Sequence, residues 1–311
     1  MDFLRLLEAI RTPFLDTIFQ FFTFFGEEMI FMVIALGFYW CLDKKTGYLL
    51  LYVSFLGNII NSFLKLIFLV PRPWVLDKNF TIVESARAEA TGYSFPSGHT
   101  QNSAGMFLSI VWSRKELAVR IVCVALTLLV AFSRMYLGVH TPADVLVSLG
   151  VALLLVAVGY PLLNRAWDNK KWFIPLLGVL LAVGAALILY IELVPMPANA
   201  IAEFSLSCYD SGYKMVGGAV GFALVVWLER KYINFSVEAV WWAQLLKLAL
   251  GIGAVLVVRM LLKAPLLALF GGHNVGNAVR YFLMVLVGGA LWPMTFKFFG
   301  KLGQKKESPA V

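Results

Sequence analysis

Long blocks of apolar residues, separated by short polar connectors, make up most of this sequence. A helix that crosses the hydrocarbon core of a bilayer needs about 20 predominantly apolar residues. Nine blocks come close to that length: residues 25–42, 46–70, 97–113, 117–137, 142–163, 172–193, 212–228, 240–262 and 278–299. The pattern predicts an all-α fold, a polytopic membrane helical bundle of about nine transmembrane helices.

Residues 1–24 precede these blocks and carry a different pattern. Their apolar residues recur at helical spacing, and the charged residues lie off that stripe. The stripe consists of Leu4, Leu7, Ile10 and Phe14, and the charges are Arg5, Glu8 and Arg11. This pattern favours a helix that lies in the membrane interface over a tenth span.

The connectors between the blocks alternate in charge, which predicts an orientation. Every second connector is basic: Lys44 and Lys45, Arg114 and Lys115, Arg165, Lys170 and Lys171, Arg230 and Lys231, then Lys297, Lys301, Lys305 and Lys306. Basic connectors stay on the cytoplasmic side. The connector 194–211 contains no Lys or Arg, as expected of an outer loop. We therefore expect the N-terminus outside and the C-terminus in the cytoplasm.

Composition agrees with a membrane protein and excludes several other classes. Hydrophobic residues make up 60% of the 311 residues and charged residues only 14%, whereas soluble domains carry about 25% charged residues. Lys and Arg outnumber Asp and Glu by 26 to 18, but no basic face or aromatic-basic motif indicates nucleic-acid binding. The three cysteines form no Cys-x-x-Cys pair, so neither a zinc site nor a disulfide framework is expected.

The loop 71–96 breaks the charge pattern, because it lies outside by this count and yet contains Arg72, Lys78 and Arg87. Three segments around it hold the unusual polar residues. They are Lys65 to Pro73, Tyr93 to His99, and Ser133 to Asp144. By the span count, all three lie at the outer ends of the second to fifth helices. Ionisable groups at membrane depth are costly, so their gathering at one face indicates function.

In the first segment, Lys65 and Arg72 are seven residues apart, about two helical turns, and can share one face. Pro71 and Pro73 bracket Arg72 and should end the helix there. The planar fork of an arginine suits phosphate oxygens. Taken alone, a lysine near a helix end could simply extend to the interface.

In the second segment, Pro96-Ser97-Gly98 has the pattern of a helix start with Ser97 as the cap. A helix N-terminus directs free N–H groups and a positive dipole at an anion, and Gly98 allows a ligand to approach the backbone. His99 then lies in the first turn beside that anion. A serine cap and one interfacial histidine would mean little by themselves.

In the third segment, Thr141-Pro142 begins a helix and Asp144 lies one turn beyond His140. The carboxylate could accept from His140 Nδ1–H and leave Nε2 as a nucleophile. It could instead complete a helix cap with Thr141, or do both. Arg134 adds another fixed positive charge. Because Lys and Arg surround the pair of His140 and Asp144, a metal cation would be repelled, and no cofactor is expected.

These segments resemble the three signature motifs of the type 2 phosphatidic acid phosphatase superfamily. The pattern is Lys-x6-Arg-Pro, then Pro-Ser-Gly-His, then Ser-Arg-x5-His-x3-Asp, and every specified residue matches in order. The resemblance covers roughly residues 20–165 and implies a six-helix phosphatase core. It divides the chain into an interfacial helix (1–24), the phosphatase core (25–165), additional transmembrane helices (166–299) and a basic cytoplasmic tail (300–311).

The resemblance also implies roles for eight residues. His140 would attack phosphorus and form a phosphohistidine, Asp144 would orient it, and His99 would act as acid and base. The phosphate-binding set would be Lys65, Arg72, Ser97, the Gly98 N–H and Arg134. No metal would be required.

The substrate remains open at this stage. A site at the membrane rim favours a lipid phosphate or diphosphate, such as a polyisoprenyl diphosphate, phosphatidic acid, phosphatidylglycerol phosphate or a sphingoid phosphate. A soluble phosphate ester, as in the glucose-6-phosphatase branch, phosphotransfer to another acceptor, and transport are the alternatives. The compact loops favour a bacterial inner membrane, and the oligomeric state is not predicted.

Overall fold

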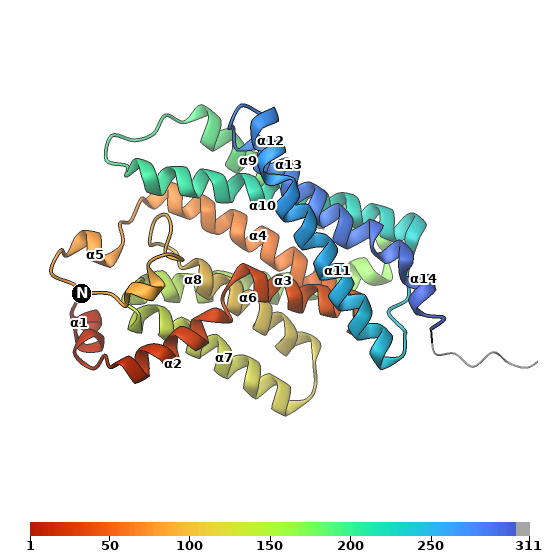
Figure 1. Ribbon diagram of the computed structural model, residues 1–311, viewed down its shortest axis with the longest axis horizontal. Helices are drawn as coiled ribbons and strands as arrows, with labels where there is room; N and C mark the ends of the chain where they lie inside the picture. Colours follow the sequence, from red (N-terminus) through yellow and green to blue (C-terminus); the bar gives the residue numbers. More distant parts are fainter. Residues whose placement is uncertain (303–311) are drawn as a thin grey trace, which may run out of the picture.

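The computed structural model describes residues 1–302, and within them it contains helices, turns and loops but no strand (Figure 1). The helices are α1 (Asp2–Ala9), α2 (Pro13–Phe24), α3 (Glu28–Gly37), α4 (Lys44–Phe68), α5 (Pro73–Leu76), α6 (Gly98–Ser113), α7 (Leu117–Tyr136), α8 (Pro142–Asp168), α9 (Phe173–Leu193), α10 (Ala202–Leu228), α11 (Trp241–Leu261), α12 (Lys263–Leu269), α13 (Val275–Leu286) and α14 (Phe296–Phe299). The prediction of an all-α membrane bundle is confirmed. Lys305 and Lys306 of the predicted tail lie outside the described residues.

The predicted count of nine spans is not confirmed. Over residues 1–302, seven helices are long and apolar enough to cross a membrane, and α2 with the α3 segment forms one more candidate, bent by 45°. The predicted span that the structure does not confirm is the third one, residues 97–113, where α6 lies. This helix has 16 residues, about 24 Å, against a hydrocarbon core of about 30 Å. Its cap at Ser97 and its end before Arg114 fix that length.

The N-terminal stretch differs from the single interfacial helix that its pattern predicts. The structure divides it into α1 and α2, because Thr12 caps a new helix: Leu15 N–H donates to Thr12 Oγ1 over 3.3 Å, and Pro13 occupies the first helical position. α2 then meets α3 at the 45° bend, so it is continuous with the first predicted span. The interfacial location of this stretch stays a prediction.

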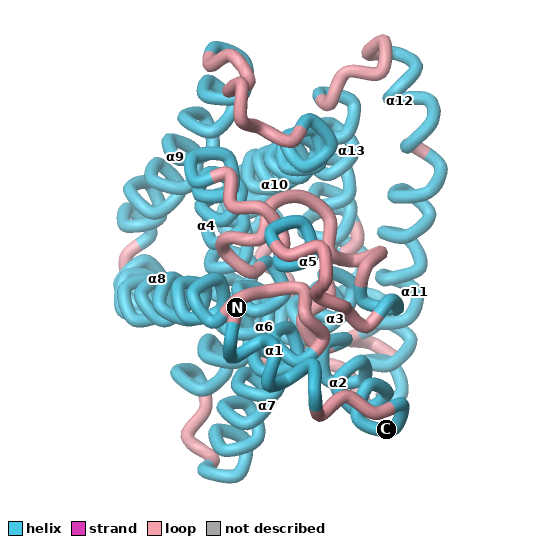
Figure 2. The backbone as a smooth tube through the Cα atoms, turned by 90° about the vertical axis from the view of Figure 1, so that its left-hand side faces the viewer, coloured by secondary structure: helices cyan, strands magenta, loops and turns pink. Residues whose placement is uncertain are grey.

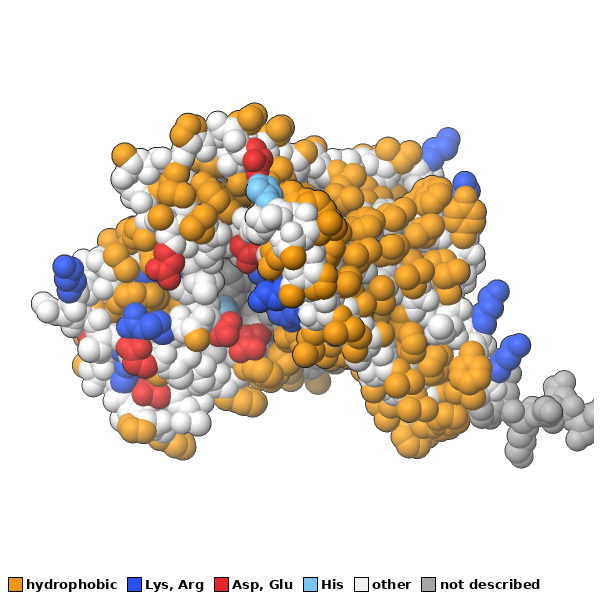
Figure 3. Space-filling model, turned by 45° about the horizontal axis from the view of Figure 1, so that its top comes forward, with side chains coloured by type: hydrophobic (Ala, Val, Ile, Leu, Met, Phe, Trp, Pro, Cys, Tyr) orange, Lys and Arg blue, Asp and Glu red, His pale blue; other side chains and the backbone are white. Residues whose placement is uncertain are grey.

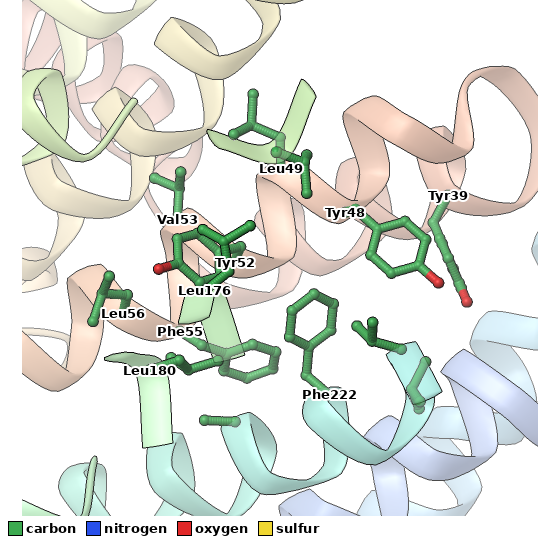
Figure 4. Close-up of a cluster of buried hydrophobic side chains, with 14 of the residues drawn as sticks. Tyr39, Tyr48, Leu49, Tyr52, Val53, Phe55, Leu56, Leu176, Leu180 and Phe222 are labelled. Carbon is green, nitrogen blue, oxygen red and sulfur yellow. The ribbon is translucent and has the colours of Figure 1, made fainter. Parts of the chain in front are cut away.

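The main hydrophobic core surrounds α4. Helices from both the earlier and the later part of the chain pack around it. Figure 4 shows side chains of α4 directed at Phe222 of α10 and at Leu176 and Leu180 of α9. The α4 residues in this view are Tyr48, Leu49, Tyr52, Val53, Phe55 and Leu56. This packing joins the motif-bearing helices to the later helices in one bundle.

α10 and α13 approach each other closely, and glycines on α10 make this possible. A Cβ at Gly217 would lie 2.0 Å from the Ala278 carbonyl oxygen, and one at Gly221 would lie 2.9 Å from that of Phe282. Small residues four apart allow membrane helices to pack backbone against backbone. The α10–α13 pair therefore forms a closely packed wall, and α10 lies against α4.

The basic connectors gather at one end of the bundle. Lys44 Nζ lies 2.6 Å from Glu229 Oε1, Lys170 Nζ donates to the Arg230 carbonyl, and the Arg230 guanidinium lies over the Trp167 ring. Lys and Arg side chains mark this edge in Figure 3. The N-terminus, α1 and α5 lie at the opposite end, where the three polar segments also meet (Figures 1 and 2).

Candidate active site

The three polar segments lie at the ends of four neighbouring helices. Lys65 is in the last turn of α4, Ser97 caps α6, Arg134 is in the last turn of α7, and Asp144 is in the first turn of α8. Figure 2 looks at this end of the bundle, where the loop that carries α5 runs across the helix ends. Ser94 N–H donates to the Val70 carbonyl over 2.9 Å, which folds that loop back over α4.

Arg72 is fixed by the loop that follows it. Its side chain is almost fully buried, and it donates to three carbonyls, those of Thr91, Gly92 and Val139, over 2.7 to 3.0 Å. Its Nη1 also lies 3.0 Å from His140 Nε2. Because a guanidinium can only donate, Nε2 accepts here, and the neutral His140 ring carries its proton on Nδ1.

His140 and Asp144 form a buried pair with a third partner, Ser94. His140 Nδ1 lies 3.4 Å from Asp144 Oδ2, and both side chains are at most 2% exposed. Asp144 Oδ2 also accepts from Ser94 Oγ over 2.5 Å and from the Thr141 N–H over 2.7 Å. Asp144 completes the cap of α8 and also faces His140, so the geometry accommodates both alternatives left open for it, and its part in orienting His140 stays a prediction.

The charge state of His140 follows from these neighbours. Burial, together with the Arg72 guanidinium beside it, lowers the pKa of His140 well below its usual value, and Asp144 acts in the opposite direction. Burial disfavours the imidazolium, and a nearby cation disfavours it further. The ring is therefore neutral around pH 7, with an unprotonated Nε2, which is the form that a nucleophile needs.

The start of α6 lies beside this pair. Ser97 Oγ accepts from the Thr100 N–H over 3.4 Å, and the Ser97 N–H donates to the Asp144 carbonyl over 3.1 Å. The free N–H groups and the positive dipole end of α6 thus lie next to His140. Apart from its own helical turn, no atom lies within 4 Å of a Cβ placed on Gly98, so the space above that backbone is open.

Lys65 and Arg134 add two cations at the same place. Lys65 Nζ donates to the Tyr93 carbonyl over 2.6 Å. Arg134 is 1% exposed, and its Nη1 donates to Thr23 Oγ1 of α2 over 2.6 Å. Arg134 Nε and Nη2 and His99 Nε2 are buried without a protein partner. The two Arg134 groups are donors that need an acceptor, and an oxyanion would provide one.

A cavity of about 260 Å³ opens among these side chains. Five of the eight predicted residues line it: Lys65, Arg72, Gly98, His99 and His140. The other three lie behind that lining, with Asp144 against His140, Ser97 at the base of α6, and Arg134 against α2. Figure 3 shows a hollow surrounded by acidic, basic and histidine side chains. Within residues 1–302, no three His, Cys, Asp or Glu side chains gather as a metal site.

Three residues at this site were not predicted from the sequence. Ser94 belongs to the segment Tyr93 to His99 but lies outside its Pro-Ser-Gly-His motif, and no spacing rule assigns it to Asp144. Thr23, which holds Arg134, belongs to a stretch that was expected to form an interfacial helix. Gly26 lies in the bend after α2, where a Cβ would come within 2.9 Å of His99 Cβ. The backbone at the bend therefore packs directly against His99, and no sequence pattern indicates this contact.

Comparison with known families gives two matches. Residues 46–168 match the PAP2 superfamily, and residues 213–305 match the PAP2 superfamily phosphatase transmembrane extension. The first region contains all three polar segments. The second covers most of α10 and the helices after it.

Comparison with individual proteins gives relatives named as lipid phosphatases. The chain is 34% identical over 99 residues to the undecaprenyl-diphosphatase BcrC of Bacillus subtilis, which covers 32% of this chain and 48% of that protein. It is 30% identical over 168 residues to phosphatidylglycerophosphatase B of Bacillus subtilis, 49% and 77% of the two chains. A probable sphingosine-1-phosphate phosphatase of Dictyostelium discoideum is 25% identical over 244 residues, 73% and 57% of the two chains.

The matched part is thus about half the length of the undecaprenyl-diphosphatase and of the Dictyostelium protein. The crystal structure of Aquifex aeolicus LpxE is similar to 51% of this chain and 93% of its own, with 23% identity and a TM-score of 0.44.

Proposed function

Because the chain belongs to the PAP2 superfamily, we propose that it is a metal-independent lipid phosphate phosphatase that works through a phosphohistidine at His140. The observation that carries this proposal is that two histidines and two cations line one cavity, with the carboxylate of Asp144 and the third cation, Arg134, directly behind them. The neutral His140 ring, with Asp144 on one nitrogen and the cavity on the other, has the arrangement of an activated nucleophile.

In the first step, His140 Nε2 attacks the phosphorus atom and a P–N bond forms. The bond from phosphorus to the lipid oxygen breaks, and His99, whose protonated form the bound phosphate anion stabilises, gives its proton to that leaving oxygen. The phosphoryl group takes over the Arg72 donor that Nε2 accepts in the free enzyme. Asp144 stabilises the positive ring through the Nδ1 proton.

In the second step, a water molecule attacks the phosphorus atom while His99 accepts its proton. The P–N bond breaks, inorganic phosphate leaves, and His140 returns to its neutral form. His99 is then protonated again and ready for the next cycle.

The fixed positive charges stabilise the phosphoryl oxygens through both steps. Lys65, Arg72 and Arg134 lie around the site with Ser97 and the Gly98 N–H at the start of α6, and bonds to Tyr93, Thr91 and Thr23 hold the three cations in place. Arg134 Nε and Nη2 have no protein partner and are donors left for the phosphoryl group. Preorganised donors of this kind are worth more than donors in water, because they need no reorganisation. They supply the charge that a metal ion provides in other phosphatases, which is why no metal is included in the proposal.

The location of the cavity supports a lipid substrate at the outer face of the membrane. The cavity opens at the end of the bundle opposite to the basic connectors. Since basic connectors remain in the cytoplasm, the cavity then faces outside. A phosphate carried at headgroup level would reach it directly. A bacterial inner membrane is the setting that we propose.

The test is to measure phosphate release by the purified protein and by His140→Ala, both in EDTA. We expect the wild type to keep its activity in EDTA and the variant to lose at least about a thousandfold, since removing a nucleophile leaves only binding and electrostatic effects. A substrate that carries a radiolabelled phosphate group should transfer the label to the wild-type protein in an acid-labile form. Full activity of His140→Ala would overturn the assigned nucleophile, and loss of wild-type activity in EDTA would overturn metal independence.

A further inference from the structure

The cavity does not end at the phosphate site. It continues along α4 into the interior of the bundle, and its lining changes from charged to apolar on the way. Beyond His140 and Lys65, the α4 side presents Ser62, Asn58 and Ser54. The deeper part is lined by apolar side chains of α3, α10, α11 and α13. They are Phe31, Met32, Leu36, Met215, Phe222, Val225, Val255, Met284 and Val285.

The transmembrane extension supplies most of this apolar wall. α10 and α13 form the paired wall described above, and α11 crosses beside α13 (Figure 1). Val255 of α11 and Met284 of α13 are 3% and 5% exposed, and they pack together with Tyr281. The phosphatase segment thus provides the charged end of the cavity, and the extension provides its apolar end.

The inner end of the cavity is closed. Gly288 and Gly289 line it there, and their carbonyls accept from Trp40 Nε1 and Tyr39 Oη, each over 2.9 Å. Both aromatic side chains are fully buried. The cavity is therefore a blind channel with a charged mouth, which distinguishes it from a path across the membrane.

Its dimensions suit one hydrocarbon chain. Leu51 and Lys65, the innermost and outermost lining residues of α4, lie fourteen residues apart, about 21 Å along the helix axis. One leaflet of the hydrocarbon core is about 15 Å thick, so a membrane-length chain fits lengthwise. The volume of 260 Å³ is the space open to the centres of water-sized spheres, so its mean cross-section over that length, about 12 Å², is a circle about 4 Å across for atom centres. Carbon is larger than that sphere, and two chains in contact need their axes at least about 4 Å apart, so one chain axis fits this column and two side by side do not.

On the basis of the phosphatase function proposed above, we propose that the transmembrane extension encloses the hydrocarbon chain of the substrate, and that the substrate is a single-chain lipid phosphate. The channel is continuous with the phosphate site, so one molecule can place its phosphate at His140 and its chain between α3, α10, α11 and α13. A diacyl lipid would have to leave one chain outside or force the helices apart. The channel therefore selects by the number of chains.

The experiment compares kcat/KM of the full-length protein in one detergent for five substrates. Lysophosphatidic acid and sphingosine phosphate carry one linear chain, a polyprenyl diphosphate carries one branched chain, phosphatidic acid carries two chains, and p-nitrophenyl phosphate carries none. We expect kcat/KM for the linear single-chain lipids to exceed kcat/KM for phosphatidic acid by about tenfold or more. Which of the single-chain substrates is best identifies the lipid class.

Val255→Phe tests the channel directly, because the larger ring would enter it between Met284 and Gly288. Overfilling packed space should lower the ratio of single-chain lipid to p-nitrophenyl phosphate kcat/KM by about 5- to 150-fold. Val257→Phe on the same helix is the matched control, since Val257 is 53% exposed on the outer face and should leave that ratio unchanged. Met284→Ala should widen the channel and therefore raise kcat/KM for phosphatidic acid relative to kcat/KM for the single-chain lipids.

The outcomes separate the two proposals. No phosphate release from any substrate, p-nitrophenyl phosphate included, would overturn the phosphatase function. Equal rates for one-chain and two-chain lipids would overturn the single-chain channel and leave the phosphatase in place, as would an unchanged ratio in Val255→Phe. If Val255→Phe does not fold, Met284→Ala decides: an unchanged preference between one-chain and two-chain lipids rejects the channel.

Discussion

Ser94 provides the sharpest test of how His140 is held. Its hydroxyl donates to Asp144 Oδ2 over 2.5 Å and lies 3.5 Å from His140 Nδ1, and the side chain is fully buried. Ser94→Ala removes a donor from a carboxylate but keeps the Thr141 N–H donor in place. We therefore expect Asp144 to remain near His140 with a less fixed orientation. Ser94 acts through Asp144 and is a positioning residue.

The magnitude follows from the hydrogen bond that is lost. A hydrogen bond to a charged group contributes about 1.5–3 kcal/mol. If that energy is fully used to orient the nucleophile, kcat/KM falls by about 10- to 150-fold, because each 1.36 kcal/mol is a factor of ten. The loss should appear mainly in kcat, because Ser94 does not line the cavity and makes no predicted contact with substrate.

The assay is steady-state phosphate release, with Ser109→Ala as the matched control. Ser109 is a fully buried serine on α6 whose hydroxyl donates to the Gly105 carbonyl, so the chemical change is the same at a position outside the site. The double variant Ser94→Ala/Asp144→Asn gives the coupling. Independent residues add within about 0.3–0.5 kcal/mol, a factor of about two. Fully multiplicative losses, or a Ser94→Ala loss no larger than that of Ser109→Ala, would refute the role of Ser94.

Two further predictions follow from the charges. Asp144→Asn removes the carboxylate that raises the pKa of His140. The acid limb of the variant's residual activity should therefore lie at lower pH than that of the wild type. A shift of this limb to higher pH would contradict the expected direction. Glu229→Ala leaves Lys44 and the Tyr48 hydroxyl without a buried carboxylate, and it should destabilise the detergent-solubilised protein by about 3–5 kcal/mol, seen as a lower Tm. Glu84→Ala, which removes an exposed pair with Arg87, should leave Tm nearly unchanged, and equal effects of the two variants would contradict that assignment.

The fold class and the meeting of the three polar segments could be predicted because lipid restricts both. A chain in a bilayer must pair its backbone within helices, so apolar blocks become helices and their ends become the places for charge. The signature then named Lys65, His99 and His140 from segments separated by many residues, and all three line one cavity. The local pattern carried this information because each residue lies at a helix end.

The bend between α2 and α3 and the short α6 could not be predicted in the same way. Both depend on contacts between distant parts of the chain: Gly26 packs against His99, and the Asn102 amide donates to the Gly26 carbonyl. Block length alone suggested complete spans in both places. A helix that starts within a buried site need not cross the full bilayer, because the protein around it satisfies its end.

The role of the later helices also depended on long-range contacts, and Tyr93 shows how closely they are tied to the site. Its carbonyl accepts from Lys65 Nζ, while its hydroxyl lies 3.0 Å from Ser205 Oγ on α10. At the other end of the bundle, Glu229 accepts from Lys44 and Tyr48 of α4. α10 and the turn after it are thus attached to α4 near both ends, through Tyr93 at one end and directly through Glu229 at the other, which supports a constant width for the proposed channel. A fixed width is what selection by chain number requires, because helices free to move apart would admit a second chain.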